Sequence, residues 1–149
     1  QYQCEEPNTC LISNGFCSMG FALPGVIAAK MVHPDRRCLA ICGDGGFMMG
    51  GINEFNTAVR MKQDLIVIVA NDSAYGAEHV QFLDRKMDPG LATFNWPSFA
   101  DVANALGGQG VQVNSAEDLE AAIKVMETRD RPLLIELHLD PNDVPRMRM

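Results

Sequence analysis

Two short polar turns hold the residues of this sequence whose types and spacing best suit chemistry. The first turn is GDGG at 43–46, and the second is NDSAYG at 71–76. Gly43, Gly45 and Gly46 have no side chains, so their backbone amides can approach an anion closely. A helix that starts just after the first turn would add free N–H groups and the positive end of its dipole. The first turn is therefore a candidate phosphate-binding site.

A carboxylate inside such an anion site makes chemical sense if a divalent cation lies between it and the phosphate. Asp44 provides the carboxylate, and the second turn offers the Asn71 amide oxygen and the Ser73 backbone carbonyl. Magnesium prefers oxygen ligands in octahedral geometry, usually a carboxylate or two together with substrate phosphates. We therefore predict a magnesium site made by Asp44, Asn71 and Ser73, completed by phosphate oxygens and water.

Each of these features has a simpler interpretation when it is taken alone. GDGG is also an ordinary tight turn after a strand, Asn71 is typical of a turn or helix cap, and Asp44 of an N-cap. The combination is more specific, because residues 46–70, between GDG and Asn71, are filled by a helical pattern and a strand pattern.

Helical and strand-like segments alternate along the chain, without an internal repeat. The patterns predict a helix in the second half of 18–32 and an irregular stretch at 77–96, with a short helix and then a surface loop. Further helices are expected at 51–62, 96–108 and 116–129, strands at 37–42, 64–70, 110–113 and 132–139, and a tail at 140–149. This alternation predicts an α/β fold whose mostly parallel sheet carries helices on both faces. In such sheets ligands bind beyond the carboxyl ends of the strands, where both polar turns are expected.

Local signals support two of the helix ends. Gly107 and Gly108 are C-cap candidates for the helix at 96–108. Ser115 with Asp118 three residues later approximates a capping box for the helix that follows.

Composition narrows the function classes. The chain has 149 residues, 47% hydrophobic and 21% charged, which fits one globular domain. Its formal net charge is −7, and its basic clusters, Arg36 with Arg37 and Arg146 with Arg148, are short, so nucleic acid is not an expected partner. No apolar stretch is long enough to predict a membrane span, and no signal-peptide pattern opens the sequence. The five cysteines contain no CxxC pair, so we expect reduced thiols in the cytoplasm, and their spacing does not favour a metal site.

The segment GDGGFMMGGINEFNTAVRMKQDLIVIVAND resembles the thiamine-diphosphate motif, which opens with GDG and closes about thirty residues later with two Asn. The resemblance implies that Asp44, Asn71 and the Ser73 carbonyl bind Mg²⁺. It also implies that the amides of Gly45, Gly46 and Phe47 bind the diphosphate. Ala70 replaces the first Asn of the family motif, which is not the metal ligand.

A second match lies upstream, where NGFCSMGFALPGVIAAK resembles a segment of acetolactate synthases and related 2-oxo-acid decarboxylases. In that family a bulky apolar residue lies beneath the thiazolium ring and holds the cofactor bent, which implies this role for Met19. A backbone carbonyl two residues earlier accepts from the pyrimidine amino group, which implies Cys17. The family usually has Gly there, so Cys17 is a departure.

The second turn continues as Tyr75-Gly76-Ala77-Glu78-His79, which resembles decarboxylases with Tyr-Gly after the Asn. Tyr75 and Gly76 are therefore expected at the cofactor, and Glu78 and His79, which can both move protons, are catalytic candidates. An exposed helix start is the alternative for this segment. The resemblance covers about residues 12–140.

The resemblance also implies a missing part. In the family a Glu from a separate pyrimidine-binding domain, contributed by a neighbouring subunit, activates the cofactor, and nothing in residues 1–149 resembles that domain. We therefore expect a single diphosphate- and Mg²⁺-binding domain, incomplete at its N-terminus, that works in a homo- or hetero-oligomer. It belongs either to a longer polypeptide or to a two-chain enzyme.

The expected activity is that of a lyase or transferase acting on a small 2-oxo acid, by decarboxylation or carboligation. The alternatives are a non-catalytic regulatory subunit of the same fold and a Rossmann-type nucleotide-binding oxidoreductase. The second alternative requires GxGxxG after the first strand, which GDGGFMMGG does not match.

Overall fold

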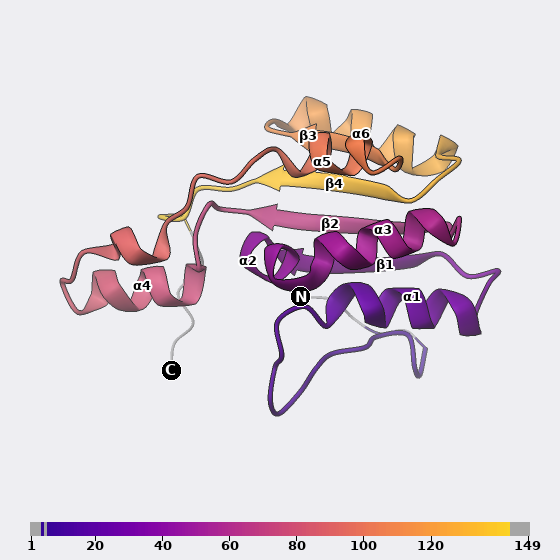
Figure 1. Cartoon of the computed structure of the whole chain (residues 1–149). Coiled ribbons are helices and arrows are strands. Elements are labelled where there is room, and N and C mark those ends of the chain that lie inside the picture. Colours follow the sequence, from indigo (N-terminus) through magenta and orange to yellow (C-terminus); the bar gives the residue numbers. More distant parts are fainter. Residues whose placement is uncertain (1–3, 5, 144–149) are drawn as a thin grey trace.

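The computed structural model describes Cys4 and residues 6–143. Four strands form one sheet in the order β1-β2-β4-β3, and every neighbouring pair is parallel (Figure 1). The strands are β1 (Cys38–Gly43), β2 (Leu65–Asn71), β3 (Gln109–Val113) and β4 (Leu133–His138). The predicted α/β fold is confirmed, with a sheet that is parallel throughout. Most of the predicted tail, with Arg146 and Arg148, lies outside the described residues.

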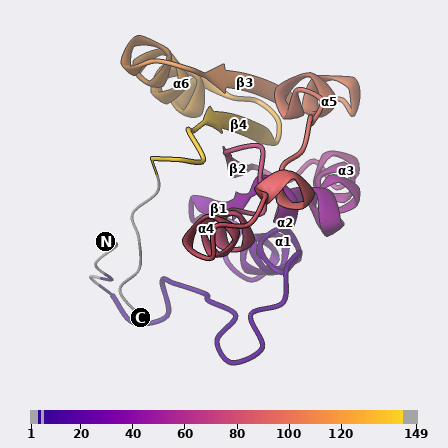
Figure 2. The same cartoon turned by 90° about the vertical axis from the view of Figure 1, so that its left-hand side faces the viewer.

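Helices cover both faces of the sheet, as predicted. The helices α1 (Ala22–Val32), α3 (Ile52–Arg60) and α5 (Phe99–Ala105) pack on one face around a core of fully buried aromatic and aliphatic side chains, among them Phe55 and Phe99. The helix α6 (Ala116–Thr128) packs on the opposite face through a second core cluster. Figure 2 shows α6 on the other side of the sheet from α3 and α5. No helix among the described residues is long and apolar enough to cross a membrane.

The strand register decides which turns become neighbours. Gly43 pairs with Ala70 between β1 and β2, and Asn71 pairs with His138 between β2 and β4. Because parallel strands end at the same edge, the residues that follow Gly43 and those that follow Asn71 start side by side. Beyond this edge lies α4 (Gly76–Asp84), as Figure 1 shows.

The first polar turn is itself helical, which places the helix start earlier than predicted. Gly43 is extended (φ −75°, ψ 165°), and the chain then enters α2 (Asp44–Gly46) and the π-helical turn η1 (Phe47–Gly51). A kink at Gly50, whose φ of 175° is not helical, separates this turn from α3. The apolar period that predicts a helix from residue 51 starts later than the helix, because the glycines of the turn carry no apolar signal.

The helix predicted from residue 96 begins at Phe99 instead. Pro97 disfavours helical backbone for the residue before it, and Ser98 caps the helix by accepting a hydrogen bond from the Asp101 amide at 3.1 Å. Before it, the chain forms α4, the 3₁₀ turn η2 (Pro89–Ala92) and an extended stretch that includes Trp96. Trp96 therefore lies outside the helix and is free to reach the strand tips.

Both predicted helix-end signals are present in the structure. Gly107 has φ +90° and donates to the Asn104 carbonyl, and Gly108 donates to the Ala103 carbonyl, which together make a Schellman C-cap. Ser115 accepts from the Asp118 amide at 3.1 Å, as the capping box requires. The Asp118 carboxylate reaches back to the Asn114 amide at 3.0 Å, one residue before the cap.

We predict that Ser115→Ala lowers the free energy of unfolding by about 1 kcal/mol, since it removes the acceptor of one amide in the first turn of α6. Urea unfolding followed by circular dichroism measures the loss. Ser115→Asp keeps an acceptor at the cap and is the matched control, with stability close to that of the wild type. Equal destabilisation by both substitutions would contradict the assignment of this cap.

Candidate cofactor site

The Asp44 carboxylate joins the two polar turns. It is 2% exposed, and its Oδ1 atom accepts from the Gly45 amide at 2.7 Å. Its Oδ2 atom accepts from the Ala74 amide in the second turn at 3.1 Å and from the Trp96 indole Nε1 at 2.9 Å. The first turn is thus bonded through one side chain both to the second turn and to the segment that precedes α5.

The electrostatic surroundings of Asp44 suit a cation. Burial raises the pKa of the Asp44 carboxyl above its ordinary value, and the charge of Asp72 raises it further. Hydrogen bonds from the Gly45 amide, Trp96 and the Ala74 amide lower this pKa in part. Within the described residues the ionised carboxylate is held by neutral dipoles, so a bound divalent cation would supply the positive charge that they do not.

Asn71 is placed against the same turn. It is 4% exposed, and its Oδ1 atom accepts from the Ser73 amide at 3.0 Å and from the Ser73 hydroxyl at 3.4 Å. Asp44 and Asn71 therefore accept from successive amides, those of Ala74 and Ser73. The structure brings the three residues predicted to bind Mg²⁺ together at one edge of the sheet. A carboxylate, an amide oxygen and a carbonyl are the hard oxygen ligands that Mg²⁺ accepts.

Ser73 has an unusual backbone. Its φ of +57° lies in the left-handed region, and its carbonyl accepts a hydrogen bond from the Phe94 amide at 2.8 Å. A carbonyl oxygen has two lone pairs, so one remains for the predicted contact with a cation.

Some backbone amides of the first turn already donate hydrogen bonds within the protein. The Phe47 amide donates to the Asp44 carbonyl, and its ring is fully buried, 5.3 Å from the ring of Phe99. Phe47 is thus a core residue whose amide already has a partner within the helix, and its contact with a diphosphate stays a prediction. Helix geometry leaves the amides of Gly45 and Gly46 without partners inside the helix, and that of Gly45 turns to the Asp44 side chain.

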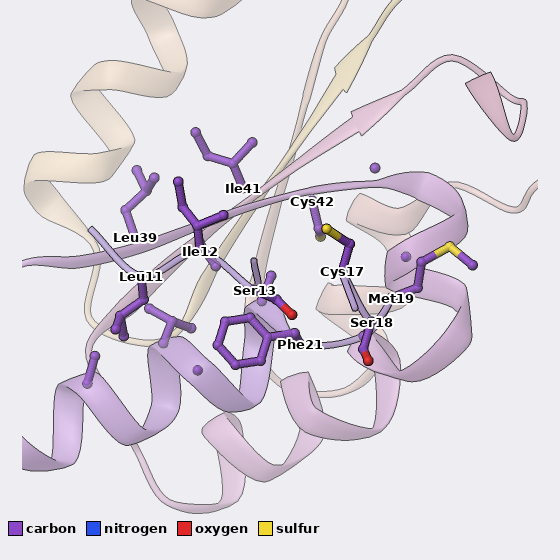
Figure 3. A pocket seen from close by; sticks show the side chains of 18 of the residues that line it. Leu11, Ile12, Ser13, Cys17, Ser18, Met19, Phe21, Leu39, Ile41 and Cys42 are labelled. Carbon is purple, nitrogen blue, oxygen red and sulfur yellow. The ribbon is translucent and has the colours of Figure 1, made fainter. Parts of the chain in front are cut away.

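Beside the strand tips lies a cavity of about 1000 Å³. It is lined by the N-terminal segment, α1, β1, the first turn and residues 74–78. Figure 3 shows Cys17, Met19 and Cys42 among the side chains around it. Met19, predicted to support the cofactor, is 61% exposed within this lining. Cys17 adopts φ +50°, in the left-handed region that favours glycine.

The two catalytic candidates are placed differently. Glu78 is exposed and lines the cavity, together with Tyr75 and Gly76, the two residues predicted at the cofactor. His79 is 4% exposed and is absent from the cavity lining, and neither of its ring nitrogens has a hydrogen-bond partner in the described part of the chain. The helical turn of α4 therefore presents Glu78 to the cavity and directs His79 into the protein.

Two residues of the site lie outside the sequence motifs. Trp96 bonds to Asp44, and the fully buried Glu136 of β4 accepts from the Asn71 Nδ2 atom at 2.8 Å. The sequence holds a signal for Glu136, a charged residue within the apolar strand PLLIELHL at 132–139, whereas nothing near Trp96 in the chain indicates its partner.

No metal cluster of another kind is present in residues 4 and 6–143: no three His, Cys, Asp or Glu side chains there are placed to hold a metal ion. All five cysteines are free thiols. Burial, and secondarily the charge of Asp44, raises the pKa of the Cys42 thiol to about 12.

Comparison with known proteins identifies the family of this fold. Residues 1–137 match the family model of the thiamine pyrophosphate enzyme, C-terminal TPP binding domain. The chain belongs to this family, and the Rossmann-type alternative is thereby set aside.

Among its relatives is an acetolactate synthase of Bacillus subtilis (strain 168), 33% identical over 93% of this chain and 24% of that protein. A sulfoacetaldehyde acetyltransferase of Alcaligenes xylosoxydans xylosoxydans is 33% identical over 89% of this chain and 23% of that protein. A solved structure, the thiamine diphosphate-dependent 4-hydroxybenzoylformate decarboxylase of Rhodococcus jostii RHA1, superposes with a TM-score of 0.72 at 31% identity. The match covers 82% of this chain and 23% of that one. The chain thus spans about a quarter of the length of the relatives that it matches.

A matched pair of glycine substitutions tests the packing of the first turn. A Cβ atom at Gly45 would lie 2.5 Å from the Tyr75 ring, whereas one at Gly46 meets only Cys42 Cβ, at 4.0 Å. We predict that Gly45→Ala destabilises the protein by about 1–3 kcal/mol because the ring must move. Gly46→Ala should be neutral or stabilising by up to about 1 kcal/mol, since alanine favours helix. Chemical denaturation of both variants decides, and equal effects would refute this packing.

Proposed function

We propose that this chain binds thiamine diphosphate through Mg²⁺ as the diphosphate-binding half of a lyase or transferase acting on 2-oxo acids. The observation that carries the proposal is the Asp44 carboxylate, buried at the strand tips and bonded to the turn that also holds Asn71 and Ser73. The names of the relatives, which include acetolactate synthases and a decarboxylase, support this range of reactions.

Each residue has a distinct part in the proposed binding. Asp44, the Asn71 amide oxygen and the Ser73 carbonyl hold Mg²⁺, and the amides of Gly45 and Gly46 face the diphosphate. Met19 supports the bent cofactor from the cavity side, and the Cys17 carbonyl accepts from its amino group. Thiamine diphosphate, when bound, supplies the carbanion-stabilising chemistry itself. Glu78 is the titratable side chain beside Tyr75 that is exposed to the cavity and can move a proton there.

The proposed active site also needs a partner domain or subunit with the activating Glu. An uncovered apolar surface beside the cavity supports this part of the proposal. Leu39 and Ile41 of β1 share the sheet face of Ile66 and Ile68, yet they are 41% and 66% exposed, because α6 covers only the other strands of that face. Leu11 and Ile12 add exposed apolar side chains to the same cavity lining. Contiguous apolar exposure of this kind marks interaction surfaces in soluble proteins.

Calorimetry tests the binding proposal directly. Thiamine diphosphate with Mg²⁺ is expected to bind the wild type, and Asp44→Ala to lose binding by more than the roughly 10–100-fold that removal of an outer-shell partner costs. Asp72→Ala, which removes a carboxylate from the same turn outside the proposed ligand set, is the matched control and should keep most of the affinity. Unchanged affinity in Asp44→Ala would rule out the metal assignment.

Thiol labelling supplies a second test with a built-in control. At pH 8 a thiol with a pKa of about 12 is ionised in only about one molecule in ten thousand, so Cys42 should resist iodoacetamide. Cys17, exposed in the cavity lining, should be labelled, and thiamine diphosphate with Mg²⁺ should protect it. Cys4, exposed outside that lining, should react equally with and without the cofactor. Mass spectrometry resolves the three sites, and equal labelling of Cys17 in both conditions would contradict the proposed cofactor position.

A further inference from the structure

Glu136 is a buried carboxylate with no role in the proposed chemistry. It lies on β4, is fully buried, and shares its sheet face with Asn71 of the neighbouring strand. An ionised side chain in such a place is costly unless it is well hydrogen-bonded. The hydrogen-bond partners of Glu136 therefore show which interactions stabilise it in this buried position.

Both carboxylate oxygens of Glu136 face donors. The Oε1 atom accepts from Asn71 Nδ2 at 2.8 Å, with His138 Nε2 at 3.6 Å on the same oxygen. The Oε2 atom accepts from the Ala100 amide at 3.0 Å and from the Ser98 hydroxyl at 3.2 Å. The Ser98 oxygen itself accepts from the Asp101 amide and from Gln112 Nε2, so its proton is left for Glu136.

This arrangement fixes the orientation of the Asn71 amide. An Asn side chain has an accepting end and a donating end, and the Oε1 atom of Glu136 accepts from the donating end. Nδ2 must therefore face Glu136, and Oδ1 faces the second turn, where the Ser73 amide donates to it at 3.0 Å. The opposite orientation would set oxygen against the carboxylate and a donor against the Ser73 N–H.

We propose that Glu136 is a positioning residue that holds the Asn71 amide with its oxygen, and not its nitrogen, toward the divalent cation. The inference rests on the proposed function, because it concerns the same cation. It adds that the cation site depends on a carboxylate of β4 that does not touch the ion and that belongs to none of the motif residues.

The isosteric variant Glu136→Gln tests the inference most sharply. The Ala100 amide can only donate, so the single oxygen of the introduced glutamine is drawn to Ala100 and Ser98, and its NH₂ group turns to Asn71. Asn71 must then reverse and present nitrogen to the cation. We expect the affinity for Mn²⁺ in the presence of thiamine diphosphate, measured by electron paramagnetic resonance on the full chain, to fall roughly 10–100-fold.

A second substitution restores the geometry if the inference holds. In Glu136→Gln combined with Asn71→Asp, the new carboxylate accepts from the introduced glutamine with one oxygen and offers the other to the cation, so Mn²⁺ affinity should recover. Asn71→Asp alone opposes two buried carboxylates and should bind Mn²⁺ poorly. The matched control is Ser115→Ala, which removes the α6 cap and no contact of Glu136. It should lower the melting temperature while Mn²⁺ affinity stays unchanged.

Nuclear magnetic resonance gives a measurement that needs no cofactor and no variant. A scalar coupling across the hydrogen bond from Asn71 Nδ2 to the Glu136 carboxylate should be detectable in the wild-type chain without any added ligand. Its absence would overturn the inference even if Glu136→Gln does not fold.

The outcomes separate the two proposals. Failure of the wild type to bind Mn²⁺ with thiamine diphosphate overturns the proposed function, and this inference with it. Binding by the wild type together with unchanged affinity in Glu136→Gln overturns the inference alone. A folded double variant that fails to recover affinity also overturns it, because a purely structural role for Glu136 predicts no such rescue.

Discussion

The buried Asp44 carboxylate is the constraint on which the site depends. An ionised group that is 2% exposed must satisfy its oxygens, and Asp44 does so with donors from three parts of the chain, Gly45, Ala74 and Trp96. These bonds fix the first turn relative to the second and hold the segment before α5 against both. These hydrogen bonds offset only part of the free energy that burying the charge costs, as the raised pKa of Asp44 indicates. The positive charge of a cation between the two turns would offset the remainder.

The parallel sheet makes this arrangement possible before any side chain is considered. The pairing of Gly43 with Ala70 and of Asn71 with His138 brings three strand ends to one edge, so turns that are distant in sequence meet. Each proposed side-chain ligand is then held by a residue from a third place in the chain. Trp96 directs Asp44, and Glu136 directs Asn71. Support of this kind orients ligands and tunes their affinity in metal sites generally.

The sequence predicts well those features that depend on residues close together in the chain. The apolar run at 64–70 marks β2, and Gly107 with Gly108 marks the end of α5, because strand burial and helix capping depend on neighbouring residues. Motif spacing also brings Asp44 near Asn71. The contacts of Trp96 and Glu136 span 52 and 65 residues, and no local pattern encodes a partner at that distance. The burial of His79 was not predictable either, because the irregular sequence at 77–96 does not show which face of α4 is buried.

Hydrogen bonding and exposure differ between the two ends of the site, in a way that fits a cofactor held at one end. At the strand tips, the side-chain oxygens of Asp44 and Asn71 are almost fully buried and all accept hydrogen bonds. Toward the cavity, Met19 and Ile41 are 61% and 66% exposed, so apolar surface lies open there. A charged diphosphate needs preorganised oxygens and amides, whereas a ring system gains most from apolar surface that it can cover. The polar and apolar ends of the site therefore match the two ends of thiamine diphosphate, and the same uncovered surface is where the proposed partner domain would have to close.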